Sequence, residues 1–149
     1  MQKEFLTNIL AQNIMTTSFS LNRVSGENAG LRLNSQCASA GFIFRHIAET
    51  MHLFTTFLGM TTDVKNTTMG STDTGQGSDV EESRRLISKG FQLLEQIIAT
   101  MPDEDWLQMI DTPFFGSVTR LRLFSHILFH NSHHAGQIAL TLQRGVLTE

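Results

Sequence analysis

The chain has 149 residues, of which 40 % are hydrophobic, and this predicts one soluble globular domain over residues 1–149 with a substantial core. The net charge is -3 and the eleven lysines and arginines are scattered, which argues against binding to nucleic acid. No apolar stretch approaches the roughly 20 residues that span a bilayer, and the N-terminus has no signal-peptide layout, so we expect a cytoplasmic protein without a membrane partner.

Helical periodicity dominates the sequence, and the first predicted helix runs from about Lys3 to Asn22. Glycines then break the helical pattern between Ser25 and Leu33. The polar positions of this helix are interpreted as its solvated side, with an extension of a functional site as the alternative. They are Asn13, Thr16 and Asn22. The apolar residues of one broad side are Phe5, Leu6, Ile9, Leu10 and Phe19.

The second predicted helix begins near Asn34 or Ser35, either of which can cap a helix, and ends at about Leu58, before Gly59. His46 lies within its series of apolar residues. Cys37 is interpreted as a small buried residue early in this helix, with a reactive thiol as the alternative. A single cysteine forms no internal disulfide, which fits a reducing compartment.

Residues 60–77 are polar and rich in glycine, and we interpret them as a mobile linker, with a loop that covers a site as the alternative. The third predicted helix opens with a capping box formed by Ser78 and Glu81, and it ends at about Thr100, before Pro102. The sequence therefore indicates both where this helix begins and where it ends.

Residues 103–116 are expected to form a short turn and an irregular or briefly extended segment, followed by a fourth helix from about Ser117 to Gly145. Four helices of this length predict an all-α four-helix bundle with long loops between helices 1 and 2, 2 and 3, and 3 and 4.

Histidines cluster in the fourth predicted helix. His130 and His134 are four residues apart and therefore point the same way, on the side that also carries apolar residues. Two imidazoles at this spacing can bind one transition-metal ion, whereas core hydrogen bonds would be the alternative explanation. Helical zinc proteases have a glutamate directly after the first histidine, where this chain has Asn131, so that class of enzyme is excluded.

A metal site usually needs a third protein ligand, and His46 on the second helix is the candidate. His126, one turn before His130, is the second choice. His133 points about 80° away from the pair. We expect His126, His133 and His52 to be surface residues or to support the metal ligands without binding the ion.

We also make a prediction for two further residues of the fourth helix. Gln137 lies near the histidines and either binds a ring nitrogen or a ligand, or is a half-exposed solubilising residue. Gly136 predicts a close approach between helices, because a glycine inside a helix costs about 1 kcal/mol relative to alanine.

Three features together resemble the DinB-like family of bacterial metal-binding four-helix bundles, also called the YfiT-like metal-dependent hydrolase superfamily. They are His46 in the second helix, the segment T-P-F-F-G-S-V-T-R-L-R-L-F, and H-N-S-H-H-A-G-Q-I. The resemblance implies that His46, His130 and His134 hold a divalent ion such as nickel, zinc or manganese, with water completing its shell. Many members have arginine where this chain has Ala135, so the resemblance implies no charge contact at this position.

The resemblance also implies activities that include thiol-dependent S-transfer with a low-molecular-weight thiol such as bacillithiol. Our first hypothesis is therefore a metal-dependent thiol S-transferase or hydrolase with a small-molecule substrate or thiol as its partner. The second is a metal-binding, stress-associated bundle without catalysis that acts as a homodimer. No acidic residue is predicted on the core side of either histidine helix, although Glu49 borders it, so the catalytic residues stay unassigned.

Overall fold

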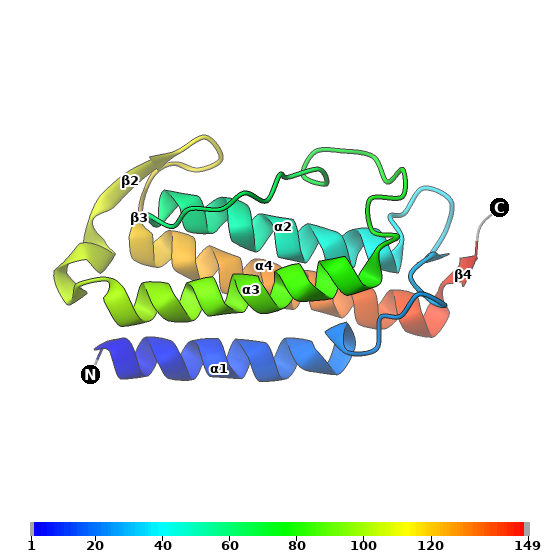
Figure 1. Cartoon of the computed structure of the whole chain (residues 1–149), viewed down its shortest axis with the longest axis horizontal. Helices are drawn as coiled ribbons and strands as arrows, with labels where there is room; N and C mark the ends of the chain where they lie inside the picture. Colours follow the sequence, from blue (N-terminus) through cyan, green and yellow to red (C-terminus); the bar gives the residue numbers. More distant parts are fainter. Residues whose placement is uncertain (1, 148–149) are drawn as a thin grey trace.

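The computed structural model describes residues 2–147 and is a bundle of four long helices whose axes run side by side (Figure 1). It confirms the predicted all-α four-helix bundle. The helices are α1 (Gln2–Leu21), α2 (Ala40–Phe57), α3 (Val80–Thr100) and α4 (Arg120–Arg144). Both α1 and α2 pack against α3 and α4, so α1 and α2 are diagonal neighbours. Within residues 2–147, none of the helices is long and apolar enough to cross a membrane.

The core lies between α2, α3 and α4 and includes fully buried residues from each helix: Ile47, Met51, Leu94, Ile97, Leu123, Ile127 and Ile138. On α1 only part of the expected apolar side is buried, because Phe5 and Phe19 are exposed.

The prediction that Asn13 faces solvent is wrong. Its amide is buried and donates to the carbonyl oxygen of Leu128 and to the hydroxyl of Ser132, which ties α1 to α4.

Two predicted helix starts are corrected by the residues that cap them. Helix α2 begins after Ser39, whose hydroxyl accepts from the amide of Phe42, so the predicted start at Asn34 or Ser35 is wrong. Asn34 instead accepts the amide of Cys37 in a turn, and Cys37 is half-buried ahead of the helix. Helix α3 is capped by the carboxylate of Asp79 and not by the predicted capping box.

Two short two-stranded sheets accompany the helices. β1 (Leu31–Arg32) pairs antiparallel with β4 (Val146–Leu147). A 3-10 helix, η1 (Asp103–Leu107), leads into a hairpin of β2 (Met109–Thr112) and β3 (Gly116–Thr119). The hairpin agrees with the predicted turn and briefly extended segment. Because β3 continues to Thr119, which caps α4, this helix starts three residues later than predicted.

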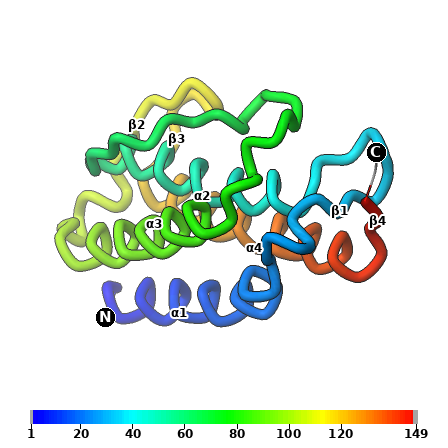
Figure 2. Tube along the Cα trace, turned by 45° about the vertical axis from the view of Figure 1, so that its right-hand side comes forward, coloured from blue at the N-terminus to red at the C-terminus, as the bar shows by residue number. Residues whose placement is uncertain are grey.

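The segment 60–77 runs back along α2 in both views of the chain (Figures 1 and 2). The buried carboxylate of Glu49 on α2 accepts from the amides and hydroxyls of Thr67 and Thr68. At its end the segment meets the start of α2 so closely that a Cβ on Gly41 would lie 2.6 Å from the carbonyl oxygen of Gly77. The interpretation as a mobile linker is therefore wrong, because the segment is anchored at both points.

Gly136 does not mark a close approach between helices. A Cβ added at this position would meet no atom within 4 Å. The predicted reason for a glycine inside α4 is therefore wrong, because the described residues leave room for the Cβ of an alanine at this position.

Candidate metal centre

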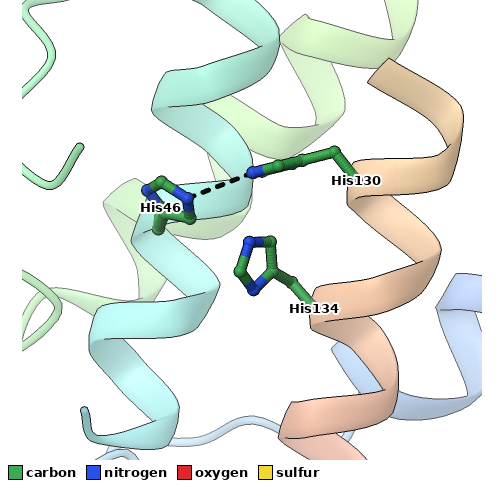
Figure 3. Close-up of side chains that lie close together, drawn as sticks. All are labelled: His46, His130 and His134. Atoms are coloured by element: carbon green, nitrogen blue, oxygen red, sulfur yellow. Dashed lines mark hydrogen bonds between the residues drawn. The ribbon is translucent and has the colours of Figure 1, made fainter. Parts of the chain in front are cut away.

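His46 on α2 and the pair His130 and His134 on α4 form one group of imidazoles between the two helices (Figure 3). One nitrogen from each ring lies within 4.8 Å of the others. Nε2 of His46 is 3.1 Å from Nε2 of His130, and the ring centres of His130 and His134 are 4.3 Å apart. The structure thus brings together the three histidines that the helical spacing selects.

The position of these histidines follows from the packing of α2 against α4. His130 and His134 lie one turn apart on the side of α4 whose Leu123, Ile127 and Ile138 are fully buried. This side faces α2, and His46 meets it from the opposite helix. Two adjacent turns of one helix and one turn of its neighbour therefore supply three nitrogens to a shared space.

The three rings are held in the neutral form that binds metal ions. Burial, with the charge of His134, lowers the pKa of His46 from 6.5 to about 4. Burial, with the neighbouring His134 and His46, lowers the pKa of His130 to about 2. Burial also lowers the pKa of His134. A metal ion binds the lone pair of a neutral imidazole, so the lowered pKa values reduce the competition between protons and a metal ion for these rings.

A hydrogen-bonded chain orients the ring of His46. The hydroxyl of Thr68 is 2.9 Å from a carboxylate oxygen of Glu49 and 3.1 Å from Nδ1 of His46. Because the carboxylate can only accept, the hydroxyl donates to it, and the hydroxyl oxygen in turn accepts from Nδ1–H of His46. The lone pair of His46 is then on Nε2, the nitrogen that faces His130, and a carboxylate-supported histidine of this kind is common at metal sites.

The expectation that Glu49 only borders the core side is wrong, and sequence reasoning therefore missed the support that it gives to His46. The side chain of Glu49 is fully buried and is paired with Arg45 at 2.7 Å. Burial raises the pKa of this carboxyl, but the hydrogen bonds from Arg45, Thr67 and Thr68 outweigh burial and hold the pKa below its usual value. Glu49 is three residues after His46, on the neighbouring turn of the same side of the helix, and this spacing was the signal that could have identified it.

His134 and His130 differ in how their second nitrogen is bound. Nδ1 of His134 is 2.6 Å from the side-chain oxygen of Gln137, which can only accept, so Nε2 of His134 keeps its lone pair. Nδ1 of His130 is buried without a hydrogen-bond partner. Nε2 of His130 faces Nε2 of His46 at 3.1 Å, and at most one proton can lie between these two nitrogens. A divalent ion fits this group, because it would bind the lone pair on Nε2 of His134 and take the place of the proton between His46 and His130.

The other predicted site residues lie outside the three-histidine group. The ring of His126 is 6.0 Å from that of His130 and packs on Phe115, and His133 is exposed beside His134. His52 is wrongly predicted as a surface or supporting residue. It is fully buried away from the group, with Nε2 2.9 Å from the carbonyl oxygen of Leu86 and Nδ1 3.0 Å from the hydroxyl of Thr62.

The family model of the DinB superfamily matches residues 10–138, a range that includes the whole three-histidine group. The chain belongs to the DinB superfamily. This confirms the resemblance that the sequence motifs indicate. Where the resemblance implies an arginine in many DinB-like proteins, Ala135 is buried in the hydrophobic core of this chain. A search of curated proteins found no match.

Proposed function

We propose that this member of the DinB superfamily binds one divalent ion, such as nickel, zinc or manganese, through His46, His130 and His134, and is a metal-dependent thiol S-transferase or hydrolase. The observation that carries the proposal is the convergence of three neutral imidazole nitrogens within 4.8 Å. When bound, the ion would supply Lewis acidity that lowers the pKa of a bound water or thiol and so provides a nucleophile near neutral pH.

The residues around the site support this function by orienting the ligands and admitting a small molecule. Thr68 and Glu49 orient His46, and Gln137 orients His134. A cavity of about 300 Å³ borders His46 and His134, which gives a substrate or a thiol access to the site. The lining of this cavity has no carboxylate that could act as a general base, so the activation of a nucleophile depends on the ion.

A second candidate function is a metal-binding bundle without catalysis that acts as a homodimer. It is favoured by large apolar side chains that are exposed on α1 and α4. Phe19 is 72 % exposed and Phe129 is 76 % exposed, and aromatic side chains are enriched at protein interfaces relative to the rest of the surface. In this candidate the same three histidines would hold the ion for structural stability.

A rate measurement distinguishes the two candidates. The metal-loaded protein is incubated with a low-molecular-weight thiol and a haloarene, and in parallel with an activated ester. For an enzyme we expect a rate at least about tenfold above that of the metal-stripped protein in one of the two reactions. His134→Ala should remove this difference. Rates equal to those of the stripped protein in both reactions would favour the non-catalytic bundle.

A further inference from the structure

The cavity beside the three histidines has an uncharged lining. Its volume is about 300 Å³, and its walls come from the connection before α2, from α2 itself, from the anchored segment 60–77 and from α4. Besides His46 and His134, the lining residues are Leu33, Cys37, Ala38, Phe42, Ile43, Thr68, Gln137 and Thr141. The walls are therefore apolar, with two hydroxyls, one amide and one thiol as their polar groups.

Two cations adjacent in sequence to lining residues, Arg32 beside Leu33 and Arg45 beside His46, are already paired. The guanidinium of Arg32 binds Asp73 at 2.8 Å and donates to the carbonyl oxygen of Cys37. Arg45 binds the buried carboxylate of Glu49. Burying a charged group in an apolar cavity is unfavourable unless the group is paired, and apart from an ion bound to His46 and His134 the lining offers no charged partner for a carboxylate or an ammonium group.

The cavity is also the open side of the three-histidine group. On the other side of the group, the ring centre of His126 lies 6.0 Å from that of His130. The ring of His126 also packs against the rings of Phe115 and Phe54, with centres 4.5 Å and 5.4 Å away. These aromatic rings fill the space next to His130. A small molecule that reaches His46 and His134 therefore does so from the cavity, with its remaining atoms against Phe42 and Ile43.

We propose that the cavity binds an uncharged, mostly apolar small molecule about the size of one substituted ring, which presents a single metal-binding group toward His46 and His134. This proposal rests on the proposed metal-dependent function and restricts its substrate class, because it disfavours substrates and thiols that carry a carboxylate in addition to the metal-binding group. The volume agrees with this size, since it lies at the lower end of ligand cavities, which span roughly 300 to 1,000 Å³.

Cys37 provides a direct readout, because it lines the cavity and is the single cysteine of the chain. The experiment measures how fast iodoacetamide alkylates Cys37 in the zinc-loaded protein, by intact mass, in the presence of either of two matched probes. Benzohydroxamic acid is uncharged, and 4-carboxybenzohydroxamic acid differs from it by one carboxylate. We expect the uncharged probe to protect Cys37 at a concentration at least about tenfold lower than the carboxylated probe.

A pair of variants tests the cause of this preference. Leu33 lines the cavity and is 38 % exposed, so a long polar side chain is tolerated there. Leu33→Arg adds a cation at the cavity wall and should improve protection by the carboxylated probe about tenfold, whereas Leu33→Gln adds polarity without charge and should not. The expected result is a gain of protection by the carboxylated probe, and a misfolded variant would not show such a gain.

The outcomes separate this inference from the function on which it rests. If the protein takes up no zinc, the metal-dependent function fails and the inference fails with it. If zinc is bound but both probes protect Cys37 equally, or neither does, the metal site stands and the inference about the cavity is wrong. Equal behaviour of Leu33→Arg and Leu33→Gln toward the carboxylated probe would also overturn it.

Discussion

Thr68 is the residue through which the anchored segment 60–77 reaches the three-histidine group. Its hydroxyl lies between the carboxylate of Glu49 and Nδ1 of His46, whereas the hydroxyl of the neighbouring Thr67 contacts Glu49 at 2.9 Å. We expect Thr68→Val to weaken zinc binding about 10- to 100-fold, because His46 loses the partner that fixes its tautomer and orientation. Competition with a chromophoric chelator measures this affinity.

Thr67→Val is the matched control for this prediction. It removes a hydroxyl from the same carboxylate but leaves the bond between Thr68 and His46 in place, so its zinc affinity should stay within a few-fold of the unmodified protein. If both variants lose the same affinity, the effect comes from the anchoring of the segment and not from the orientation of His46.

His52 should make stability depend on pH. Burial is the largest cause that lowers its pKa from 6.5 in the folded protein, so the unfolded chain binds a proton there more readily than the folded one. The free energy of unfolding therefore falls as the pH drops below about 6.5, where the unfolded state gains the proton. In His52→Gln this fall should be less steep, by at most about 1.4 kcal/mol per pH unit, the limit for one proton.

Urea denaturation of the metal-free protein at several values between pH 7.5 and about pH 5 measures both slopes. The other buried histidines are common to the two proteins and cancel in the comparison. Parallel curves would show that His52 keeps an ordinary pKa in the folded state.

At the scale of single residues, the sequence was sufficient to identify which histidines meet. Helical spacing places His130 and His134 on the core side, and it selects His46 over His52 on α2. It could not show that Glu49 is buried, because the partners that make this possible come from the distant segment at Thr67 and Thr68. Helical spacing gives the direction of a side chain but not the groups that pack against it.

Among the structural elements, the contact between Gly41 and Gly77 holds the end of the segment 60–77 against the start of α2. A Cβ on Gly77 would overlap the backbone of Gly41, so Gly77→Ala has to move one of the two segments. We expect it to lower the free energy of unfolding by about 1 to 3 kcal/mol. Gly26→Ala, at a loop position with no atom within 4 Å of the added Cβ, should change it much less.

Gly136→Ala tests the opposite case within α4. Its Cβ would meet no atom within 4 Å, and alanine favours the helix over glycine, so we expect the free energy of unfolding to rise by about 0.5 to 1 kcal/mol. Urea denaturation measures all three glycine variants. A loss of stability in Gly136→Ala would restore the expectation of a close helix approach at this position.

At the scale of elements, the long helices were predictable and their exact starts were not. Several residues near each start can cap, and the chain chooses between them by tertiary contacts. Asn34 is used in a turn, and Ser39 caps α2, where its amide also binds Asp73 from the segment 60–77. The apolar periodicity that identifies a helix contains no such information about distant partners.

For the whole molecule, periodicity predicted four helices and a bundle, but long connections left their arrangement open. The diagonal placement of α1 and α2 follows from which faces pack, including the buried bond from Asn13 of α1 to the backbone of α4. This arrangement leaves α2 and α4 in contact, and their shared face carries the histidines. The site is therefore a property of the bundle and not of either helix alone.

A metal ion that joins α2 to α4 should stabilise the bundle by mass action. At a free zinc concentration of 100 times the dissociation constant, the free energy of unfolding should rise by about 2.7 kcal/mol. Removing the ion with a chelator should reverse this gain. His130→Ala should abolish the dependence on zinc, and a midpoint of urea denaturation that is insensitive to zinc in the unmodified protein would contradict binding to the folded state.

The central claim is that His46, His130 and His134 bind a divalent ion. Elemental analysis of protein purified without an affinity tag tests it most directly, alongside His134→Ala and the exposed-histidine control His133→Ala. We expect about one metal ion per chain in the unmodified protein and in His133→Ala, and a large loss in His134→Ala. Less than roughly 0.2 ion per chain, unaffected by His134→Ala, would contradict the claim.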